Sequence, residues 1–343
     1  MGTGVGSGRK RSDSDTVVCT LDSTATRHFS RVPDKRYEAS DFEVLRTVGT
    51  GSYSVVKLAI DKASGSPVVL KVMSKSLIIR KGQVEHIKNE RAILALVKCA
   101  FIEQMKASFQ TPISLFYVLE YIPGGELFKL LSDRSVLPEG EAVFYAAEIV
   151  CALRYLHSLK CVFRDLKPEN VLIAADGHLK VADFGFAKVL RSEEKTFTLC
   201  GTPEYMAPEV IERGGHGLST DWWQLGILIY EMLYATTPFT DPSPYQLYEN
   251  IISKPVHYPT GSPVTLSLLA GLLQKRPVDR FTEEEILKHP FFQTIDWTVA
   301  ERKELRPPFV PQVTSPTDSS NFDTYNDSTQ MGTAVYVDVF PEF

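Results

Sequence analysis

The residues of this sequence whose types best suit chemistry are Asp165, Lys167, Asn170 and Asp183. The first three belong to a run R-D-L-K-P-E-N, and Asp183 begins a D-F-G turn that follows two short apolar runs joined by Asp-Gly. A carboxylate can orient a hydroxyl group and accept its proton, while Asn and Asp oxygens can hold Mg²⁺ against phosphate groups. We expect the apolar runs to form a hairpin that brings these side chains to one end of a small sheet. That arrangement suits phosphoryl transfer.

A Gly-rich segment and a lysine upstream are suited to binding phosphate. The segment G-T-G-S-Y-S lies between expected strands at 42–48 and 55–60, and its glycines allow backbone amides to approach phosphate oxygens. Lys71 closes a third apolar strand, and an expected helix at 83–97 carries Glu90, which could pair with this lysine. Taken singly, these features equally fit a hairpin turn, an edge lysine and a solvated glutamate.

The remaining elements must position these groups. An apolar strand at 115–120 leads through Tyr-Ile-Pro-Gly-Gly into a helix, so this crossing is a candidate hinge between two lobes. Helices at 139–157 and 218–235 are apolar all round and should be buried, the second with Ser219 or Thr220 as its cap. Further helices are expected at 245–252, 264–273 and 283–289.

Length and charge set broad limits. A chain of 343 residues can form one large domain or two lobes. The net charge of −5 is carried by residues 312–343, which contain five acidic residues and no Lys or Arg. Composition gives no support for nucleic-acid binding, and no apolar run reaches membrane-spanning length. Five scattered cysteines without metal spacing favour reduced thiols and a cytoplasmic location, with the nucleus as a second compartment.

With these motifs in this order, the sequence resembles the AGC group of eukaryotic Ser/Thr protein kinases, and most of all cyclic-AMP-dependent catalytic subunits. The resemblance implies an α+β, bilobal protein-kinase fold with a small β-rich N-lobe and a larger, mostly helical C-lobe. Its expected parts are a largely disordered N-terminal extension (1–41), a kinase domain (42–292, with N-lobe 42–120, hinge about 121–125 and C-lobe 126–292) and an AGC tail (293–343) ending in F-x-x-F.

The resemblance implies ATP and Mg²⁺ as cofactors. Asp165 would orient the substrate hydroxyl and accept its proton, and Lys167 would neutralise charge on the migrating phosphoryl group. Asn170 and Asp183 would hold Mg²⁺. The implied nucleotide-binding residues are Gly49, Thr50, Gly51, Ser52, Tyr53, Val56, Val69, Lys71, Glu90, Glu120, Ile122, Leu172, Asp183, Phe322 and Tyr325.

Lys71, positioned by Glu90, would hold the α- and β-phosphates. Phe322 or Tyr325 would close over the nucleotide. The two phenylalanines of the terminal F-x-x-F would dock in a pocket on the N-lobe.

By the same resemblance, the substrate would be a protein with a basic motif. Three carboxylates that converge on one groove would favour Arg at the third and second positions before the phosphoacceptor, since Arg forms paired hydrogen bonds. An apolar pocket would take the residue after it. The implied substrate-binding residues are Glu126, Glu169, Glu231, Leu199, Thr202, Pro203 and Met206.

Thr198 resembles an activation-loop phosphorylation site. A phosphate there could bridge Arg164, Lys188, Lys195 and His86 through charge-assisted contacts. Without phosphate this basic cluster would repel itself, which is the physical basis of a switch.

The resemblance makes a cyclic-nucleotide-binding regulatory subunit with a pseudosubstrate an expected kind of partner. Phe197, however, stands where the family uses a Trp for contact with that subunit. The tail lacks the usual turn phosphorylation site, for which Thr329 and Thr333 are the candidates.

Other departures concern the nucleotide site. Ser54 replaces the third loop Gly and should stiffen the loop. Val69 stands where a smaller Ala is usual, and Ala182 stands where a Thr is common before the metal-binding Asp. We expect these changes to affect nucleotide affinity and inhibitor selectivity while the reaction is retained.

Two alternatives remain open at this stage. One is a pseudokinase that acts as a scaffold, but Lys71, Glu90, Asp165, Asn170 and Asp183 are all intact. The other is an AGC kinase under different control, by cyclic GMP or by an upstream kinase.

Overall fold

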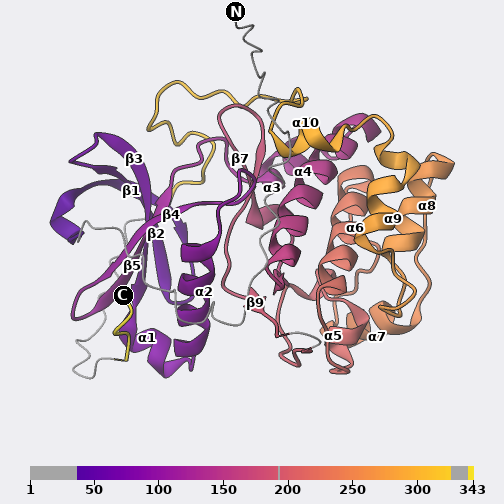
Figure 1. Ribbon diagram of the computed structural model, residues 1–343, viewed down its shortest axis with the longest axis horizontal. Helices are drawn as coiled ribbons and strands as arrows, with labels where there is room; N and C mark the ends of the chain where they lie inside the picture. Colours follow the sequence, from indigo (N-terminus) through magenta and orange to yellow (C-terminus); the bar gives the residue numbers. More distant parts are fainter. Residues whose placement is uncertain (1–36, 192–193, 326–338) are drawn as a thin grey trace, which may run out of the picture. The chain divides into compact units, whose positions relative to one another are not determined.

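The computed structural model describes residues 37–191, 194–325 and 339–343. Most of the expected N-terminal extension, and the candidates Thr329 and Thr333, lie outside these ranges. The N-lobe contains an antiparallel sheet in the order β1-β2-β3-β5-β4 (Figure 1). Its strands are β1 (Phe42–Thr50), β2 (Ser54–Asp61), β3 (Ser66–Ser74), β4 (Met105–Gln110) and β5 (Ser114–Glu120).

Strand pairing places the Gly-rich turn above Lys71. β1 and β2 are joined directly by this turn, and Gly49 pairs with Val56 at its base. β2 and β3 then pair without interruption, so that Val56 lies opposite Lys71. Because directly paired residues project from the same face of a sheet, the lysine shares its face with the base of the turn.

Two helices follow β3, namely α1 (Lys75–Arg80) and α2 (Val84–Leu96). α2 buries Ile87, Ile93 and Leu94. The hydroxyl of Tyr117, on β5, donates a hydrogen bond to the Ile87 carbonyl at 2.9 Å, which ties α2 to the sheet. The sequence predicted α2 within a residue at each end, but it predicted neither α1 nor β4.

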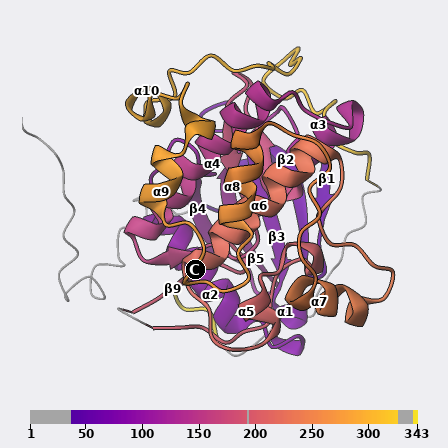
Figure 2. The same cartoon turned by 90° about the vertical axis from the view of Figure 1, so that its right-hand side faces the viewer.

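The C-lobe is helical, and α4 and α6 form its centre. In both views α4, α6 and α8 lie side by side (Figures 1 and 2). The C-lobe helices are α3 (Leu127–Arg134), α4 (Glu139–Ser158), α5 (Pro208–Ile211), α6 (Ser219–Tyr234), α7 (Pro244–Ser253), α8 (Pro263–Leu272), α9 (Glu283–Lys288) and α10 (Trp297–Glu301). The residues that α4 and α6 bury are mostly apolar, as the distribution of apolar residues on all sides of these helices predicted.

The predicted cap of α6 is wrong. The helix begins at Ser219, and no side chain caps its first turn. Thr220 is instead buried and donates to Glu209 Oε1 at 3.1 Å. Glu209 also forms a buried ion pair with Arg280, with an Nη1–Oε1 distance of 2.8 Å. The Thr220 hydroxyl therefore takes part in a tertiary hydrogen-bond network with Glu209 and Arg280, and it does not cap the helix.

Two small antiparallel sheets lie where the lobes meet. β7 (Val171–Ile173) pairs with β8 (Leu179–Val181), which is the predicted hairpin. β6 (Cys161–Val162) pairs with β9 (Lys188–Val189). These pairs fix the loop that contains Asp165 and the D-F-G turn beside each other.

The tail returns to the N-lobe by way of the hinge. Tyr121 Oη donates to the Asp318 carbonyl at 2.5 Å, and Asn321 Nδ2 donates to the Pro123 carbonyl at 3.0 Å. Arg46 Nη2, on β1, donates to the Asp323 carbonyl at 2.6 Å. This part of the tail therefore contacts both the hinge and the first strand.

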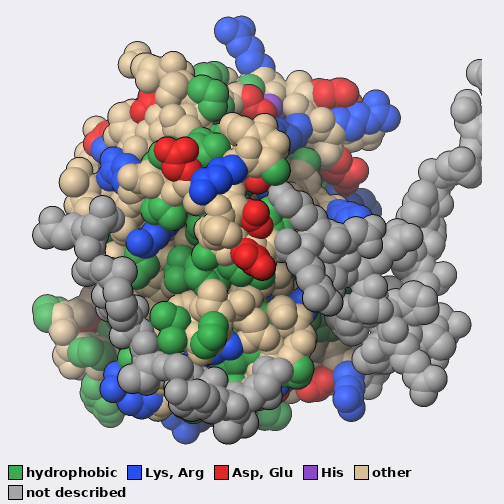
Figure 3. Space-filling model, turned by 90° about the vertical axis from the view of Figure 1, so that its left-hand side faces the viewer, with side chains coloured by type: hydrophobic (Ala, Val, Ile, Leu, Met, Phe, Trp, Pro, Cys, Tyr) green, Lys and Arg blue, Asp and Glu red, His purple; other side chains and the backbone are tan. Residues whose placement is uncertain are grey.

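On the face shown in Figure 3, positive and negative side chains are interspersed over the described surface. No helix in the described ranges is both long and apolar enough to cross a membrane. Each of the four cysteines in the described part of the chain is a free thiol, and three of them are buried.

Candidate active site

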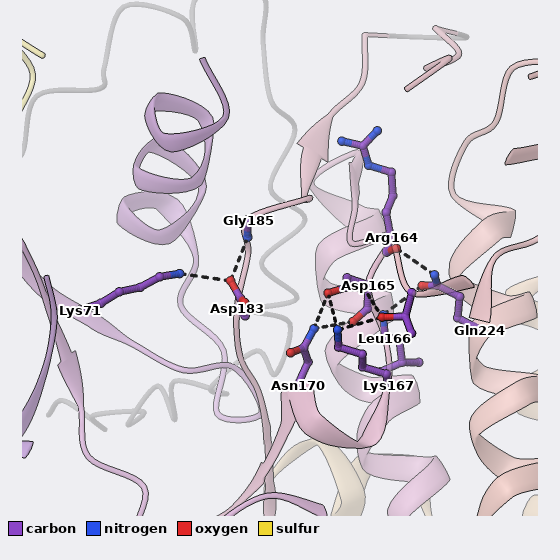
Figure 4. A network of polar contacts seen from close by, with 10 residues as sticks. Lys71, Arg164, Asp165, Leu166, Lys167, Asn170, Asp183, Gly185 and Gln224 are labelled. Atoms are coloured by element: carbon purple, nitrogen blue, oxygen red, sulfur yellow. Dashed lines mark hydrogen bonds and ion pairs between the residues drawn. The ribbon is translucent and has the colours of Figure 1, made fainter. Parts of the chain in front are cut away.

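Asp165 lies in the loop after β6, and two of the polar side chains that contact its carboxylate belong to Lys167 and Thr202. Lys167 Nζ is 3.3 Å from Asp165 Oδ2 and donates to Thr202 Oγ1 at 2.9 Å. The Thr202 hydroxyl in turn donates to Asp165 Oδ1 at 3.4 Å. Asp165 is only 4% exposed. This triangle therefore holds a carboxylate and an ammonium group side by side (Figure 4).

Asn170 connects this loop to the D-F-G turn. It ends a short 3₁₀ turn, Pro168–Asn170, and its Nδ2 donates to both Oδ2 and the carbonyl of Asp165, at 2.7 and 2.8 Å. Its own carbonyl accepts from the amide of Ala182, the residue before Asp183, at 2.9 Å. The hairpin thus brings together the side chains that the sequence predicted to meet (Figure 4).

Asn170 and Asp183 fit a magnesium ion that arrives with phosphate groups. Because Nδ2 of Asn170 is used as a donor, Oδ1 is the atom left for a ligand. The Asp183 side chain is 54% exposed. In the described ranges, no group of three or more His, Cys, Asp and Glu could hold a metal on its own. Mg²⁺ ordinarily uses one or two carboxylates together with phosphates and water, so this sparse donor set is suitable.

Lys71 forms the predicted pair with Glu90 and also contacts Asp183. Its Nζ is 2.7 Å from Glu90 Oε1 and 3.2 Å from Asp183 Oδ1. Burial would lower the pKa of Lys71, but the charges of Asp183 and Glu90 outweigh it and raise the pKa. The charge of Lys71 lowers the pKa of Asp183. A cation is therefore held permanently between the sheet, α2 and the D-F-G turn.

A cavity of about 350 Å³ opens under the Gly-rich turn, and the predicted residues Gly51, Ser52, Tyr53, Lys71 and Asp183 line it. Gly51 donates its amide to the Ser54 carbonyl at 2.8 Å, which closes the turn. A Cβ atom at Gly51 would lie 2.7 Å from Ser54 Oγ, so a side chain there would require the hydroxyl group of Ser54, which replaces the third glycine, to move.

A second cavity of about 310 Å³ shares Lys71 and Asp183 with the first. Its lining includes predicted nucleotide residues and, at its other end, part of the predicted substrate site. The predicted residues in its lining are Gly49, Thr50, Gly51, Val56, Val69, Lys71, Glu90, Glu126, Lys167, Glu169, Asn170, Asp183 and Tyr325.

Four predicted nucleotide residues lie outside both linings: Glu120, Ile122, Leu172 and Phe322. The Glu120 carboxylate is paired with Lys180 at 2.7 Å. Phe322 packs its ring against Tyr121, with the ring centroids 5.9 Å apart. Of the two aromatic residues predicted to cover the cleft, the structure therefore places Tyr325 in it.

The three predicted substrate carboxylates are close enough to influence one another. Burial and the charge of Glu169 raise the pKa of Glu126. Burial, Glu169 and Glu204 raise the pKa of Glu231 to about 7. Glu231 also accepts a hydrogen bond from the Tyr205 hydroxyl. The charge of Glu169 thus acts on both other acids, and Glu204 is a further acid near Glu231 that sequence reasoning missed.

The segment around Thr198 lies against Arg164. Thr198 is exposed. Arg164 Nη1 donates to Thr196 Oγ1 at 3.2 Å and Nε donates to the Phe186 carbonyl at 2.7 Å. The Arg164 charge also lowers the pKa of His86, after burial. Two of the four predicted basic residues are therefore near each other, whereas Lys188 pairs with Glu194 at 3.6 Å and Lys195 is exposed.

The residues predicted to form the apolar substrate pocket differ in exposure. Leu199 is 40% exposed, whereas Met206 is only 5% exposed. Pro203 begins a 3₁₀ turn, Pro203–Tyr205, that lies between them in the chain.

Glu103 is a further residue that the sequence analysis missed. It precedes β4, is 8% exposed and lines the second cavity. The signal that could have found it is a lone acid in the apolar stretch Phe-Ile-Glu.

Comparison with known proteins agrees with this geometry. Residues 42–292 match the family model described as a protein kinase domain. A human protein named cAMP-dependent protein kinase catalytic subunit PRKX is 41% identical over 295 residues, which cover 84% of this chain and 82% of that protein. Human RAC-beta serine/threonine-protein kinase is 43% identical over 291 residues, 83% of this chain and 60% of that protein.

A third relative is the fruit fly protein cAMP-dependent protein kinase catalytic subunit 3, which is 41% identical over 297 residues. These residues cover 85% of this chain and about half, 51%, of the fly protein. The matched family model covers most of the chain, and it coincides with the lobes that carry Lys71, Asp165 and Asp183. The chain therefore belongs to the protein kinase family, as a Ser/Thr kinase of the cAMP-dependent and AGC type.

Proposed function

We propose that this chain transfers the γ-phosphoryl group of Mg·ATP to Ser or Thr in Arg-Arg-x-Ser/Thr-hydrophobic sequences. The protein kinase family generally uses ATP and Mg²⁺, and the donor set at Asn170 and Asp183 fits this use. The single observation that carries the proposal is the position of the acidic groove, because Glu126 and Glu169 line the same cavity as Lys71 and Asp183.

The nucleotide half of the reaction rests on the two cavities. The Gly-rich turn and Lys71 would bind the phosphates, and Val56 and Val69 offer apolar walls for the base. Bound Mg²⁺ would supply positive charge to the phosphate oxygens. The same ammonium group that contacts Glu90 and Asp183 would then also contact phosphate.

The protein half rests on the Asp165–Lys167–Thr202 triangle. The substrate hydroxyl oxygen would form a bond to the γ-phosphorus as the bond from that phosphorus to the β–γ bridging oxygen breaks, leaving ADP. Asp165 would orient the hydroxyl and accept its proton. Lys167, 3.3 Å from Asp165, would place its charge beside the transferred group.

The acidic groove would select arginines. Glu169 belongs to the same loop as Asp165, and its charge acts on both Glu126 and Glu231. A guanidinium forms paired hydrogen bonds with a carboxylate, so adjacent arginines would use the groove better than lysines.

The test is phosphate transfer from Mg·ATP to a peptide with Arg-Arg-x-Ser followed by an apolar residue, and to the same peptide without arginines. We expect transfer that Asp183→Ala abolishes and that falls at least about 100-fold without the arginines. In a Glu231→Gln variant, the rates of transfer to the peptides with and without arginines should differ less than in the unaltered protein. Equal transfer to the two peptides would refute the proposed preference for arginine. The absence of transfer to either peptide would support the alternative that the chain is a pseudokinase scaffold.

We also propose that phosphorylation of Thr198 activates the enzyme, because Thr198 lies two residues after Thr196, which binds Arg164. A Thr198→Ala variant should retain its fold and lose most of its activity, while Thr298→Ala, at an exposed helix, serves as the matched control. A regulatory subunit with cyclic-nucleotide domains remains the proposed partner. A pull-down on such a subunit, with and without cyclic AMP or cyclic GMP, separates this control from control by an upstream kinase alone.

A further inference from the structure

Glu103 places an acid inside the nucleotide cleft. It lies between Ile102, which bridges to Val181 of β8, and strand β4. Its own amide donates to the Val181 carbonyl at 3.0 Å, so its backbone position is fixed. The residue is only 8% exposed, yet it lines the cavity together with Leu119 and Ala182.

The carboxyl group of Glu103 forms no hydrogen bond or ion pair with any residue of the described ranges. Four charged groups surround it at longer range: Lys71 on β3, Glu90 on α2, Glu120 on β5 and Asp183 after β8. Lys71, however, is already paired with Glu90 and Asp183. A buried polar group without a partner is costly, so a ligand that supplied one would bind with a gain.

Burial raises the pKa of Glu103 to about 8, although the charge of Lys71 opposes the shift. The group is therefore mostly a neutral carboxylic acid at neutral pH. In that form it has one O–H donor and one carbonyl acceptor side by side.

We propose that Glu103 is a specificity-determining residue that hydrogen-bonds the edge of the bound adenine bearing its amino group and the neighbouring ring nitrogen. This inference rests on the proposed function, since it assumes that ATP is the nucleotide. Adenine presents a donor (N6) beside an acceptor (N7) at that edge, which complements an acceptor beside a donor on the acid.

The same pairing discriminates against guanine. Guanine presents two acceptors, O6 and N7, at this edge, so the carbonyl oxygen of the acid would face O6 without a proton between them. The apolar neighbours Val69, Leu119 and Ala182 in the lining offer no alternative partner. Glu103 would then be the polar group that distinguishes adenine from guanine in an otherwise apolar part of the cleft.

The test compares three proteins and three nucleotides. The proteins are the unaltered kinase, Glu103→Gln, which keeps a donor beside an acceptor, and Glu103→Val, which removes both. The nucleotides are ATP, GTP and 7-deaza-ATP, an ATP analogue that lacks the N7 acceptor. The Michaelis constant is measured for each pair in the peptide assay, and the dissociation constant by calorimetry.

We expect Glu103→Val to raise the Michaelis constant for ATP about tenfold and to weaken discrimination against GTP and 7-deaza-ATP. Glu103→Gln should stay within about twofold of the unaltered protein, because a neutral amide offers the same hydrogen-bonding pattern. Glu85→Val, at a well-exposed glutamate of α2, is the matched control and should change none of these values.

Two results would overturn the inference. One is an unchanged preference among the nucleotides in Glu103→Val. The other is tighter ATP binding by Glu103→Val than by the unaltered protein, which would show that the Glu103 carboxyl group only opposes nucleotide binding. Failure of the proposed function is distinct, because calorimetry reports Glu103-dependent ATP binding even if no peptide is phosphorylated.

Discussion

The carboxylate of Asp221 accepts the backbone amide hydrogen of Arg164 at 2.8 Å, within the core of the C-lobe. Arg164 has a positive φ of 71°, a conformation that is unfavourable for a residue with a side chain. The same carboxylate accepts the amide of Phe163 at 3.0 Å and contacts His157 Nε2 at 2.7 Å. Gln224, one turn along α6, donates to the Arg164 carbonyl at 2.8 Å. Helix α6 therefore holds the backbone that presents Asp165 in a strained form.

Replacing Asp221 with Ala should destabilise the protein and inactivate it. The change leaves two buried amides and an imidazole without their acceptor, so we expect the free energy of unfolding to fall by about 3 kcal/mol or more. Urea unfolding and the rate of peptide phosphorylation measure the two effects. The control is Asp279→Ala, whose exposed pair with Arg276 (3.5 Å) should be worth no more than about 0.5 kcal/mol. Equal losses in both variants would contradict the role of Asp221.

Recognition of arginine should weaken as the pH falls. Burial, with the charges of Glu169 and Glu204, raises the pKa of Glu231 to about 7. Glu231 is therefore largely protonated at pH 6 and largely ionised at pH 8, where it attracts a guanidinium. We expect the preference for an arginine peptide to increase several-fold over this range. The measurement is kcat/KM for peptides with and without arginine, as a function of pH.

The matched variant for this experiment is Glu231→Gln. It removes the titration while it keeps an oxygen for the Tyr205 hydroxyl. Its peptide preference should vary less with pH than that of the unaltered protein. An identical pH profile in the two proteins would assign the effect to another group.

Glu103 should make the folded state less stable as the pH rises from about 4.5 to 8. Its pKa is raised to about 8 in the folded protein, so between these values the unfolded chain has lost a proton that the folded chain retains. The stability contributed by this group therefore falls with pH, by at most about 1.4 kcal/mol per unit, and levels off above pH 8. Glu103→Gln should flatten this part of the profile in urea unfolding. A steeper profile in the variant would show that the sign is wrong.

The C-terminal Phe343 should stabilise helix α2, which it contacts through Arg91. Its ring stacks on Tyr117 with centroids 5.6 Å apart, and the Arg91 guanidinium lies 5.3 Å from its centroid. Tyr117 donates to the Ile87 carbonyl in α2. Phe343→Ala should lower the free energy of unfolding by about 1–2 kcal/mol and reduce activity, because α2 carries the acid that pairs with Lys71.

The control for Phe343 is another aromatic residue, Tyr245, which is 79% exposed. Tyr245→Ala should leave both thermal unfolding and peptide phosphorylation nearly unchanged. If Phe343→Ala unfolded at the same temperature as the Tyr245 variant, the terminal ring would have no stabilising role.

Local pattern was sufficient for much of the fold. The mostly apolar segments at 139–157 and 218–235 predicted α4 and α6 as buried helices, because apolar residues occur on all sides of each expected helix. The Asp-Gly turn between two apolar runs predicted the β7–β8 hairpin. β4 was missed even though Met105–Gln110 alternates apolar and polar residues, as a half-buried strand does. Its pairing with β5 in the structure shows that this alternation was the usable signal.

The sequence by itself indicated the reaction chemistry, because Lys71, Asp165, Asn170 and Asp183 occur in motifs whose order can be recognised in the sequence alone. Only the tertiary structure decided which groups change their ionisation. The sequence does not give the pKa values of Glu103 and Glu231, which rise because elements distant in the chain bury these two acids. Burial and mutual charge depend on contacts between residues far apart in the chain, which periodicity and motif spacing do not encode.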